Sequence, residues 1–162
     1  MDVLTHTFAA VTLGLAGHRR WGWKGTACLT AAAAVPELER FAALGGAAVR
    51  VEAGYGAGHS LLVVPFAALL VAALVRRWLG GWKTALQVVA IALFSHLALD
   101  LLSGPGVRLL WPLWPGFSGR AIAAHYDLLI LLTLGLGLAV PQLLNLVNRD
   151  IGAVSYNLER PA

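Results

Sequence analysis

The chain has 162 residues, of which 59% are hydrophobic and only 12% are charged. Soluble domains carry about 25% charged residues, so this composition argues against a soluble protein and favours one that lies in lipid. The formal net charge is +4, but the basic residues are scattered singly and in pairs. Without a basic stripe or arm, nucleic acid is not an expected partner.

Five apolar segments follow one another along the chain, at residues 3–17, 24–44, 59–79, 83–103 and 126–147. The last three have about the 20 residues that a helix needs to cross about 30 Å of hydrocarbon. The first is short, and the second contains Pro36, where a helix is expected to end or kink. These two segments either insert partly or pack inside the bundle. We predict an all-α polytopic membrane bundle of four to five short transmembrane helices.

Between the last two segments, residues 107–117 carry Pro112 and Pro115 together with two tryptophans. This composition predicts an interfacial or re-entrant segment rather than a crossing. Residues 1–150 are expected to form a single transmembrane helical domain, and residues 151–162 a short C-terminal tail.

The basic residues predict an orientation for the bundle. Eight of the twelve lie in the short loops after the first and third segments and in the stretch after the fifth, whereas four lie in the longer opposite loops. Because Lys and Arg are enriched in cytoplasmic loops, the short loops and the C-terminus are expected in the cytoplasm and the N-terminus outside. The sequence thus predicts a multi-pass protein of the cell inner (plasma) membrane.

Most histidines and several acidic residues lie at segment ends that this topology places on the non-cytoplasmic side. They come from all five segments: His6, Glu37, Glu39, His59, His96, Asp100, His125 and Asp127. An Asp at the centre of a membrane helix costs about 2.5–3.5 kcal/mol, so such residues face the bundle interior and have partners. Histidines and carboxylates without Lys or Arg are the ligand set of zinc or a similar transition metal.

The spacing of these residues leaves alternatives open. His96 and Asp100 are four residues apart and point the same way from one helix, either toward a metal or toward each other as a pair that joins two helices. Glu37 and Glu39 are two residues apart and reach one point only if the helix is unwound there. Asp127 either caps the fifth segment or orients a ligand.

The two remaining histidines are assigned more simply. His18, in a basic loop, is expected to be an interfacial hydrogen-bonding residue. For His125 the sequence leaves two roles open, that of an interfacial hydrogen-bonding residue and that of a metal ligand.

Four motifs occur in a fixed order along the chain. They are Met-Asp-x-x-Thr-His at 1–6, an acidic box after proline at 36–39, Gly-His-Ser at 58–60, and Ser-His-x-x-x-Asp at 95–100 followed by the stretch 109–112. In this order they resemble the YdjM family of LexA-binding inner-membrane proteins, over about residues 1–130. The resemblance implies a metal-dependent hydrolase. The family is in turn similar to zinc-dependent phospholipases C, helical enzymes that cleave phosphoester bonds.

The resemblance also implies roles for individual residues. One or two zinc ions, or another divalent metal, would be held by His6, Glu37, His59, His96 and Asp100. Asp100 would bridge two metals if both are present. The general base or a supporting residue would be Glu39 or Asp127.

The chain departs from the family pattern at several positions. The acidic box reads Pro-Glu-Leu-Glu in place of Pro-Asp-x-Asp, and Leu128 follows Asp127 where the family often has proline. In residues 54–60, which end in the third motif, the family's His, Arg and Thr are replaced by Gly54, Tyr55 and Gly58. An Arg is the natural clamp for phosphate, so the Arg position bears on substrate binding.

Three functions are compatible with these observations. The leading one is a membrane-bound, metal-dependent hydrolase of a phosphoester or lipid-type substrate, with its site at the outer membrane face. The second is a catalytically degenerate family member that serves as a structural subunit of a larger membrane complex, for which Gly135 and Gly137 suit close helix contacts. The third, a small transporter, needs polar residues toward the cytoplasm, and the apolar runs 66–75 and 88–94 contain none.

Overall fold

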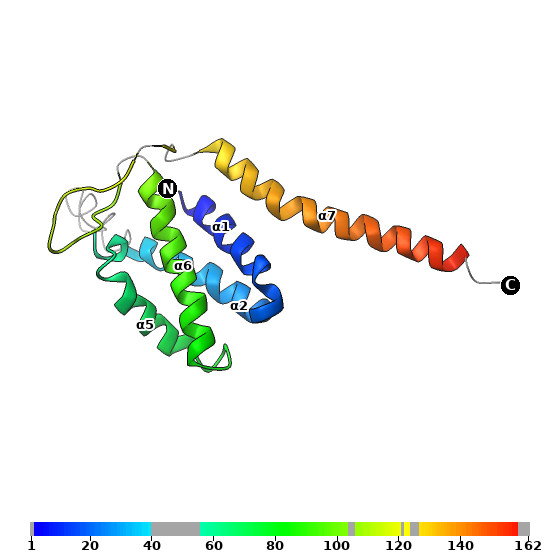
Figure 1. Cartoon of the computed structure of the whole chain (residues 1–162), viewed down its shortest axis with the longest axis horizontal. Coiled ribbons are helices and arrows are strands. Elements are labelled where there is room, and N and C mark those ends of the chain that lie inside the picture. The colour runs from blue at the N-terminus through cyan, green and yellow to red at the C-terminus, as the bar shows by residue number, and fades with distance from the viewer. Residues whose placement is uncertain (1, 40–55, 104–105, 121, 124–126, 159–162) are drawn as a thin grey trace.

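The structure is a computed structural model that describes residues 2–39, 56–103, 106–120, 122–123 and 127–158 (Figure 1). Within these ranges the chain forms α-helices, short 3-10 turns and two isolated β-bridges, and no strand. The prediction of an all-α protein is therefore confirmed for the described residues. The number of membrane crossings stays a prediction.

The first two helices form a hairpin. Helix α1 covers Val3–Ala16, and the Asp2 side chain caps it by accepting a hydrogen bond from Thr5 N at 3.0 Å. Helix α2 covers His18–Ala33 but is interrupted at Gly22, whose φ of 63° is non-helical. Glycine adopts this conformation at little cost because it has no Cβ.

Two short 3-10 turns follow, and both carry residues of the candidate site. Turn η1 covers Pro36–Leu38, where proline stops the preceding helix, and turn η3 covers Ala57–His59. The prediction that the chain unwinds after α2 is confirmed.

Helix α5 covers Val64–Val75 and is shorter than predicted. The expectation of one continuous helix over residues 59–79 was wrong, because Ser60 and its neighbours form a turn before the helix. Leu62 N donates to Ser60 Oγ at 3.2 Å, and Val63 N donates to Ser60 O at 3.1 Å. At 1.5 Å per residue, α5 is about 18 Å long and does not reach across the hydrocarbon core by itself.

The last two helices are the long ones. Helix α6 covers Trp82–Leu102 and helix α7 covers Leu128–Leu158, which extends beyond the predicted end at residue 147. In the described part of the chain, Trp82–Leu102 and Leu128–Arg149 are long and apolar enough to cross a membrane, judged by length and composition.

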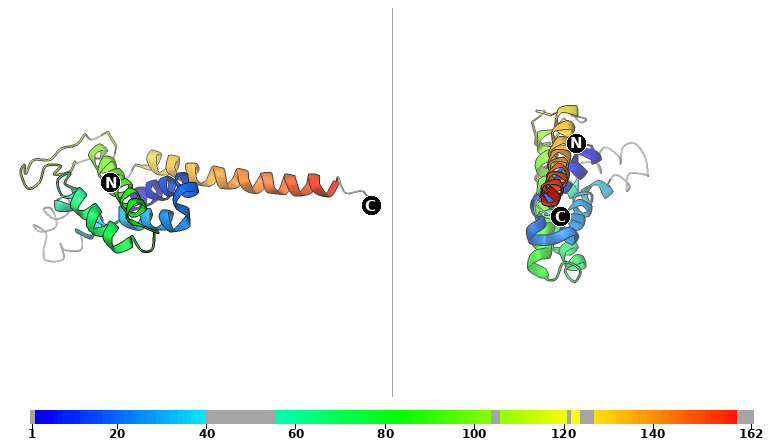
Figure 2. Two further views of the ribbon diagram at one scale, coloured as in Figure 1. Left: turned by 60° about the horizontal axis from the view of Figure 1, so that its bottom comes forward. Right: turned by 90° about the vertical axis from the view of Figure 1, so that its right-hand side faces the viewer.

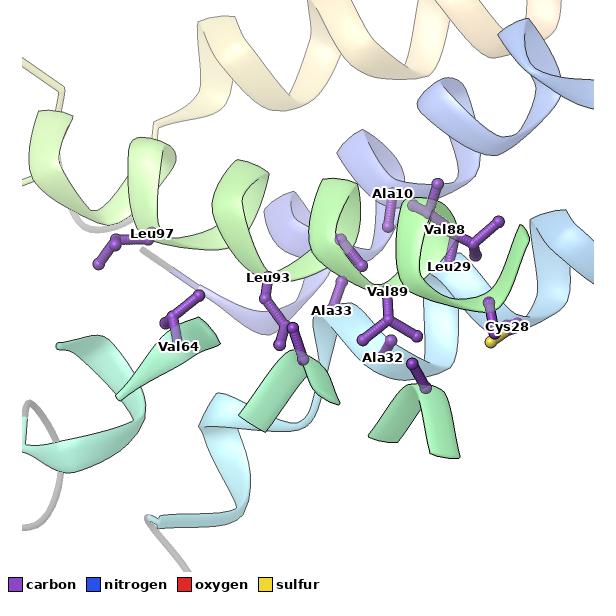
Figure 3. Packing of buried hydrophobic residues seen from close by; sticks show 14 of the residues in the cluster. Ala10, Cys28, Leu29, Ala32, Ala33, Val64, Val88, Val89, Leu93 and Leu97 are labelled. Atoms are coloured by element: carbon purple, nitrogen blue, oxygen red, sulfur yellow. The ribbon is translucent and has the colours of Figure 1, made fainter. Parts of the chain in front are cut away.

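Helix α6 lies at the centre of the bundle. Helices α2 and α5 pack against it, and α1 packs against α2 and α7 (Figure 1). The C-terminal half of α7 extends beyond the other helices (Figure 2). The core between α2, α5 and α6 consists mainly of alanine, valine and leucine, including Ala32, Val89 and Leu93 (Figure 3). Small side chains allow the helix backbones to approach closely.

Candidate metal centre

Four segments bring ionisable side chains together at the C-terminal end of α6. Helix α1 contributes a histidine from its first turns, η1 and η3 contribute one residue each, and α6 contributes two from its last turns. Their exposed fractions lie between 0% and 5%: His6, Glu37, His59, His96 and Asp100. Groups of this kind are buried only when they are paired or bind a metal.

The Nε2 atoms of three histidines surround the Asp100 carboxylate. His6 Nε2 lies 3.1 Å from Oδ1, whereas His59 Nε2 and His96 Nε2 each lie 3.2 Å from Oδ2. The Nε2 atoms of His59 and His96 are 3.3 Å apart. Glu37 Oε1 lies 3.9 Å from Nε2 of both His6 and His96. The structure thus brings all five predicted ligands together.

These distances fit a metal site. Donor atoms that surround a tetrahedral zinc ion at about 2.0–2.1 Å lie about 3.3 Å from one another. Nε2 of each histidine lies 3.1–3.2 Å from an Asp100 oxygen, and the Nε2 atoms of His59 and His96 are 3.3 Å apart. A neutral imidazole has one donor nitrogen and one acceptor nitrogen, so the contact between His59 Nε2 and His96 Nε2 needs either a proton on one of the two nitrogens or a cation that both lone pairs face. The ligand atoms of His6, His96 and Asp100 all lie within 4.8 Å of one another.

The position of His6 is fixed by the start of α1. Thr5 donates both its amide and its hydroxyl hydrogen to the Asp2 carboxylate, and His6 N donates to Asp2 O at 3.3 Å. Burial raises the pKa of Asp2, but the hydrogen bonds from Thr5 and from nearby backbone amides together outweigh this effect, so the pKa lies below its usual value. The His6 ring then stacks on the His96 ring, with centroids 3.7 Å apart. The Met-Asp-x-x-Thr-His motif therefore forms a helix cap that fixes the position of His6.

Glu39 lies behind His59 rather than among the ligand atoms. Its Oε2 is 3.5 Å from Nδ1 of His59, the nitrogen on the other side of the ring from Asp100. Gly58 N donates to Glu39 Oε1, and a Cβ at Gly58 would lie 3.0 Å from the Glu39 carboxyl carbon. A larger residue at this position would therefore have to displace the Glu39 carboxylate slightly. A carboxylate on the far nitrogen of a histidine ligand fixes its tautomer and ring orientation.

The charge around His59 favours a cation. Burial alone would lower the pKa of His59, but the carboxylates of Asp100 and Glu39 outweigh this effect and raise it to about 9. A field that stabilises an extra proton on an imidazole also stabilises a metal ion beside it.

Glu39→Gln should weaken metal binding by about tenfold to a hundredfold, as the loss of such supporting carboxylates usually does. The amide oxygen still accepts the hydrogen bond from Gly58 N, so the change removes mainly the negative charge behind His59. A competition titration against a zinc-binding dye measures the affinity. Leu38→Gln, at the exposed neighbouring position, is the control and should leave the affinity unchanged. Equal affinities for the two variants would refute the positioning role of Glu39.

The segment that contains residues 107–118 is hydrogen-bonded to Ser60 and Leu61, the two residues that follow His59. Ser60 Oγ donates to Trp111 O at 2.6 Å, and Leu61 N donates to Leu109 O at 2.8 Å. Val107 and Ser118 form an isolated antiparallel bridge. These contacts explain why the Gly-His-Ser motif and the stretch 109–112 occur together, a long-range relation that sequence reasoning missed. The interfacial location of this segment stays a prediction.

The remaining predicted residues have other places. Asp127 Oδ1 accepts a hydrogen bond from Ile130 N at 3.1 Å and so caps α7, which is one of the two roles left open by the sequence. Its role as a general base stays a prediction. His125 lies outside the described residues. His18 opens α2 and lines a pocket with Pro141 and Gln142 of α7.

Comparisons with known proteins agree with the family resemblance. The profile of a family described as "YdjM inner membrane protein" matches residues 1–157. No curated protein and no solved structure matches the chain, and the similarity to zinc-dependent phospholipases C stays a prediction. The matched residues include the whole cluster around Asp100 and the two candidate membrane spans, which supports a membrane location. The chain belongs to the YdjM inner membrane protein family.

Proposed function

We propose that the chain is a membrane-bound, metal-dependent hydrolase that acts on a phosphoester in a lipid-type substrate. The convergence of three Nε2 atoms on the buried Asp100 carboxylate carries this proposal. A pairing of His96 with Asp100 that only joins helices accounts for two of these residues. It does not account for His6 and His59 at the same carboxylate, or for Glu37 nearby.

Zinc is the ion that this donor set fits best, since imidazole nitrogens and carboxylate oxygens are its preferred protein ligands besides thiolates. A bound metal would lower the pKa of its water from 15.7 toward about 7 and polarise the scissile phosphoester. His6, His59, His96 and Asp100 would hold it.

Glu37 is the better-placed proton acceptor of the two glutamates. Its Oε1 faces the Nε2 atoms of His6 and His96 at 3.9 Å, so it can serve as a further ligand or accept a proton from the attacking water. Glu39 contacts the outer nitrogen of His59 instead, which suits orientation of that ring. Asp127 remains the other candidate base from the sequence.

The distribution of charge supports a site near the outer membrane face. The basic residues Arg76, Arg77 and Lys83 lie around the N-terminal end of α6, opposite the cluster. If the positive end faces the cytoplasm, the N-terminus lies outside, the C-terminus lies inside, and the cluster is near the depth of the outer headgroups. A lipid phosphoester is the substrate class available at that depth.

The proposal is tested on the detergent-purified chain by elemental analysis and by turnover of phospholipids. We expect zinc to copurify and to be required for turnover, so that a chelator abolishes the reaction and added zinc restores it. Turnover that persists with chelator and in His96→Ala would reject the proposal.

A second candidate function is a structural subunit that binds metal without turnover. The stretch Leu128–Arg149 of α7 has no buried residue within the described part of the structure. A Cβ at Gly135 or Gly137 would meet no atom within 4 Å there, so both are open to a neighbouring helix, and small residues favour such contacts. Copurification of a stoichiometric membrane partner, with bound metal but no turnover on any ester, would favour this function.

A further inference from the structure

An apolar cavity of about 300 Å³ lies beside the metal centre, between η1 and the helices α5 and α6. Its walls include Val35 and Leu38 on the η1 side, Val63 and Ala67 at α5, and Leu93 of α6. Glu39 is the one ionisable residue among its described walls.

The cavity and the metal centre share a wall. Glu39 and Gly58 both line the cavity and are joined by the hydrogen bond from Gly58 N to Glu39 Oε1. Glu39 Oε2 in turn lies 3.5 Å from Nδ1 of His59. The cavity therefore begins one side chain away from a metal ligand and continues from there between apolar helices.

The walls restrict the kind of occupant. An ordered water needs two to four polar partners, and a cavity with one carboxylate among apolar side chains provides too few for several waters. The space is half-open and at the lower end of the range of about 300–1,000 Å³ for small-molecule sites, so a helix of another protein, with a diameter of about 10–12 Å, could cover it but not enter it. A single hydrocarbon chain satisfies both the apolar walls and the volume.

We propose that this cavity holds one acyl chain of a membrane lipid and so positions the headgroup of that lipid beside the metal centre. The inference rests on the proposed function insofar as it treats this lipid as the substrate. The placement of the acyl chain rests on the wall that the cavity shares with the metal centre at Glu39 and Gly58. It assigns Ala67 the role of setting how much chain fits, because its methyl group is the smallest side chain on the α5 wall. A larger residue there would shorten the space for the acyl chain.

The test is photolabelling in nanodiscs that contain phosphatidylglycerol with a diazirine near the end of one acyl chain. After irradiation, labelled peptides are mapped by mass spectrometry. We expect saturable labelling of residues 35–39 and 63–67, and about a tenfold reduction there in Ala67→Phe, since displacing two buried methylenes corresponds to about that factor. Labelling of the exposed Leu70 and Leu74 should not change.

A matched control comes from the same helix. Val71 lies one turn after Ala67 and is also half-buried, but it is not among the described walls of the cavity. Val71→Phe should therefore leave the labelling of residues 35–39 unchanged. Ala67→Leu provides a milder filling variant if Ala67→Phe fails to fold, as judged by circular dichroism, and should reduce labelling to a smaller extent.

The outcomes separate this inference from the proposed function. Equal labelling of the cavity walls in the Ala67 and Val71 variants, or labelling confined to Leu70 and Leu74, would overturn the acyl-chain site even if the chain hydrolyses phospholipids. Cavity labelling that Ala67→Phe removes would support the site even in a chain without turnover, in which case only the proposed hydrolysis fails.

Discussion

Asp100→Asn should abolish stable metal binding and, with it, any hydrolysis. Each of the three Nε2 atoms lies 3.1–3.2 Å from an oxygen of this carboxylate, so Asp100 is the charge around which the histidines are arranged. The substitution removes that charge and directs an amide group at the same nitrogens. Loss of a supporting residue weakens metal sites by about tenfold to a hundredfold, and loss of this central ligand should exceed that range. Elemental analysis and dye competition measure the change.

Asp127→Asn is the matched control, since it makes the same chemical change in a carboxylate that caps α7. It should retain the parental metal content. Asp100→Asn keeps the shape of the side chain, so the variant is expected to fold, and circular dichroism confirms its helix content. Parental metal affinity in Asp100→Asn would show that the cluster is held together by hydrogen bonds and is not a metal site.

The pair on α6 could be predicted from the sequence because it depends only on helical geometry. His96 and Asp100 are four residues apart within one continuous helix. In the structure, His96 Nε2 lies 3.2 Å from Asp100 Oδ2. The meeting of His6 and His59 with this pair was also predictable, since alternating helices bring the N-terminal end of one helix to the C-terminal end of another. No periodicity, however, specifies which nitrogen of each ring faces the centre.

The roles of the two glutamates could not be assigned from sequence. Glu37 lies inside the 3-10 turn η1, whereas Glu39 is the residue that follows it with helical backbone angles. Side chains two apart on such tightly wound backbone point in different directions. The structure directs Glu37 toward His6 and His96 and Glu39 toward the outer nitrogen of His59. The direction in which each side chain points depends on how α2 packs on α6, and local sequence does not specify this packing.

The start of α5 was missed although the sequence carried a signal for it. Residues 59–79 are mostly apolar, and this pattern suggested one long helix. Proline is favoured in the first turn of a helix, and Pro65 occupies that position in α5. The turn before it is stabilised by Ser60, whose hydroxyl also reaches Trp111 O, 51 residues along the chain. Contacts of this range are invisible to hydropathy and local spacing.

Removal of the metal should destabilise the fold as well as stop hydrolysis. The cluster joins α1, η1, η3 and α6, so a bound ion links four segments that are distant in sequence. A ligand at one hundred times its dissociation constant stabilises the folded state by about 2.7 kcal/mol. For a chain of this length, each kcal/mol shifts the melting temperature by about 2–4 °C, so saturating zinc should raise it by roughly 5–10 °C over the chelated protein.

Thermal unfolding followed by circular dichroism, with chelator and after zinc is restored, measures this difference. Asp100→Asn provides the internal comparison, because a chain that does not bind the ion should melt at one temperature under both conditions. Chelation removes the charge that the carboxylates of Asp100 and Glu37 face, and the resulting repulsion adds to the loss of the links between segments. If the parental chain binds zinc but melts at the same temperature with and without chelator, the ion does not hold α1 and α6 together.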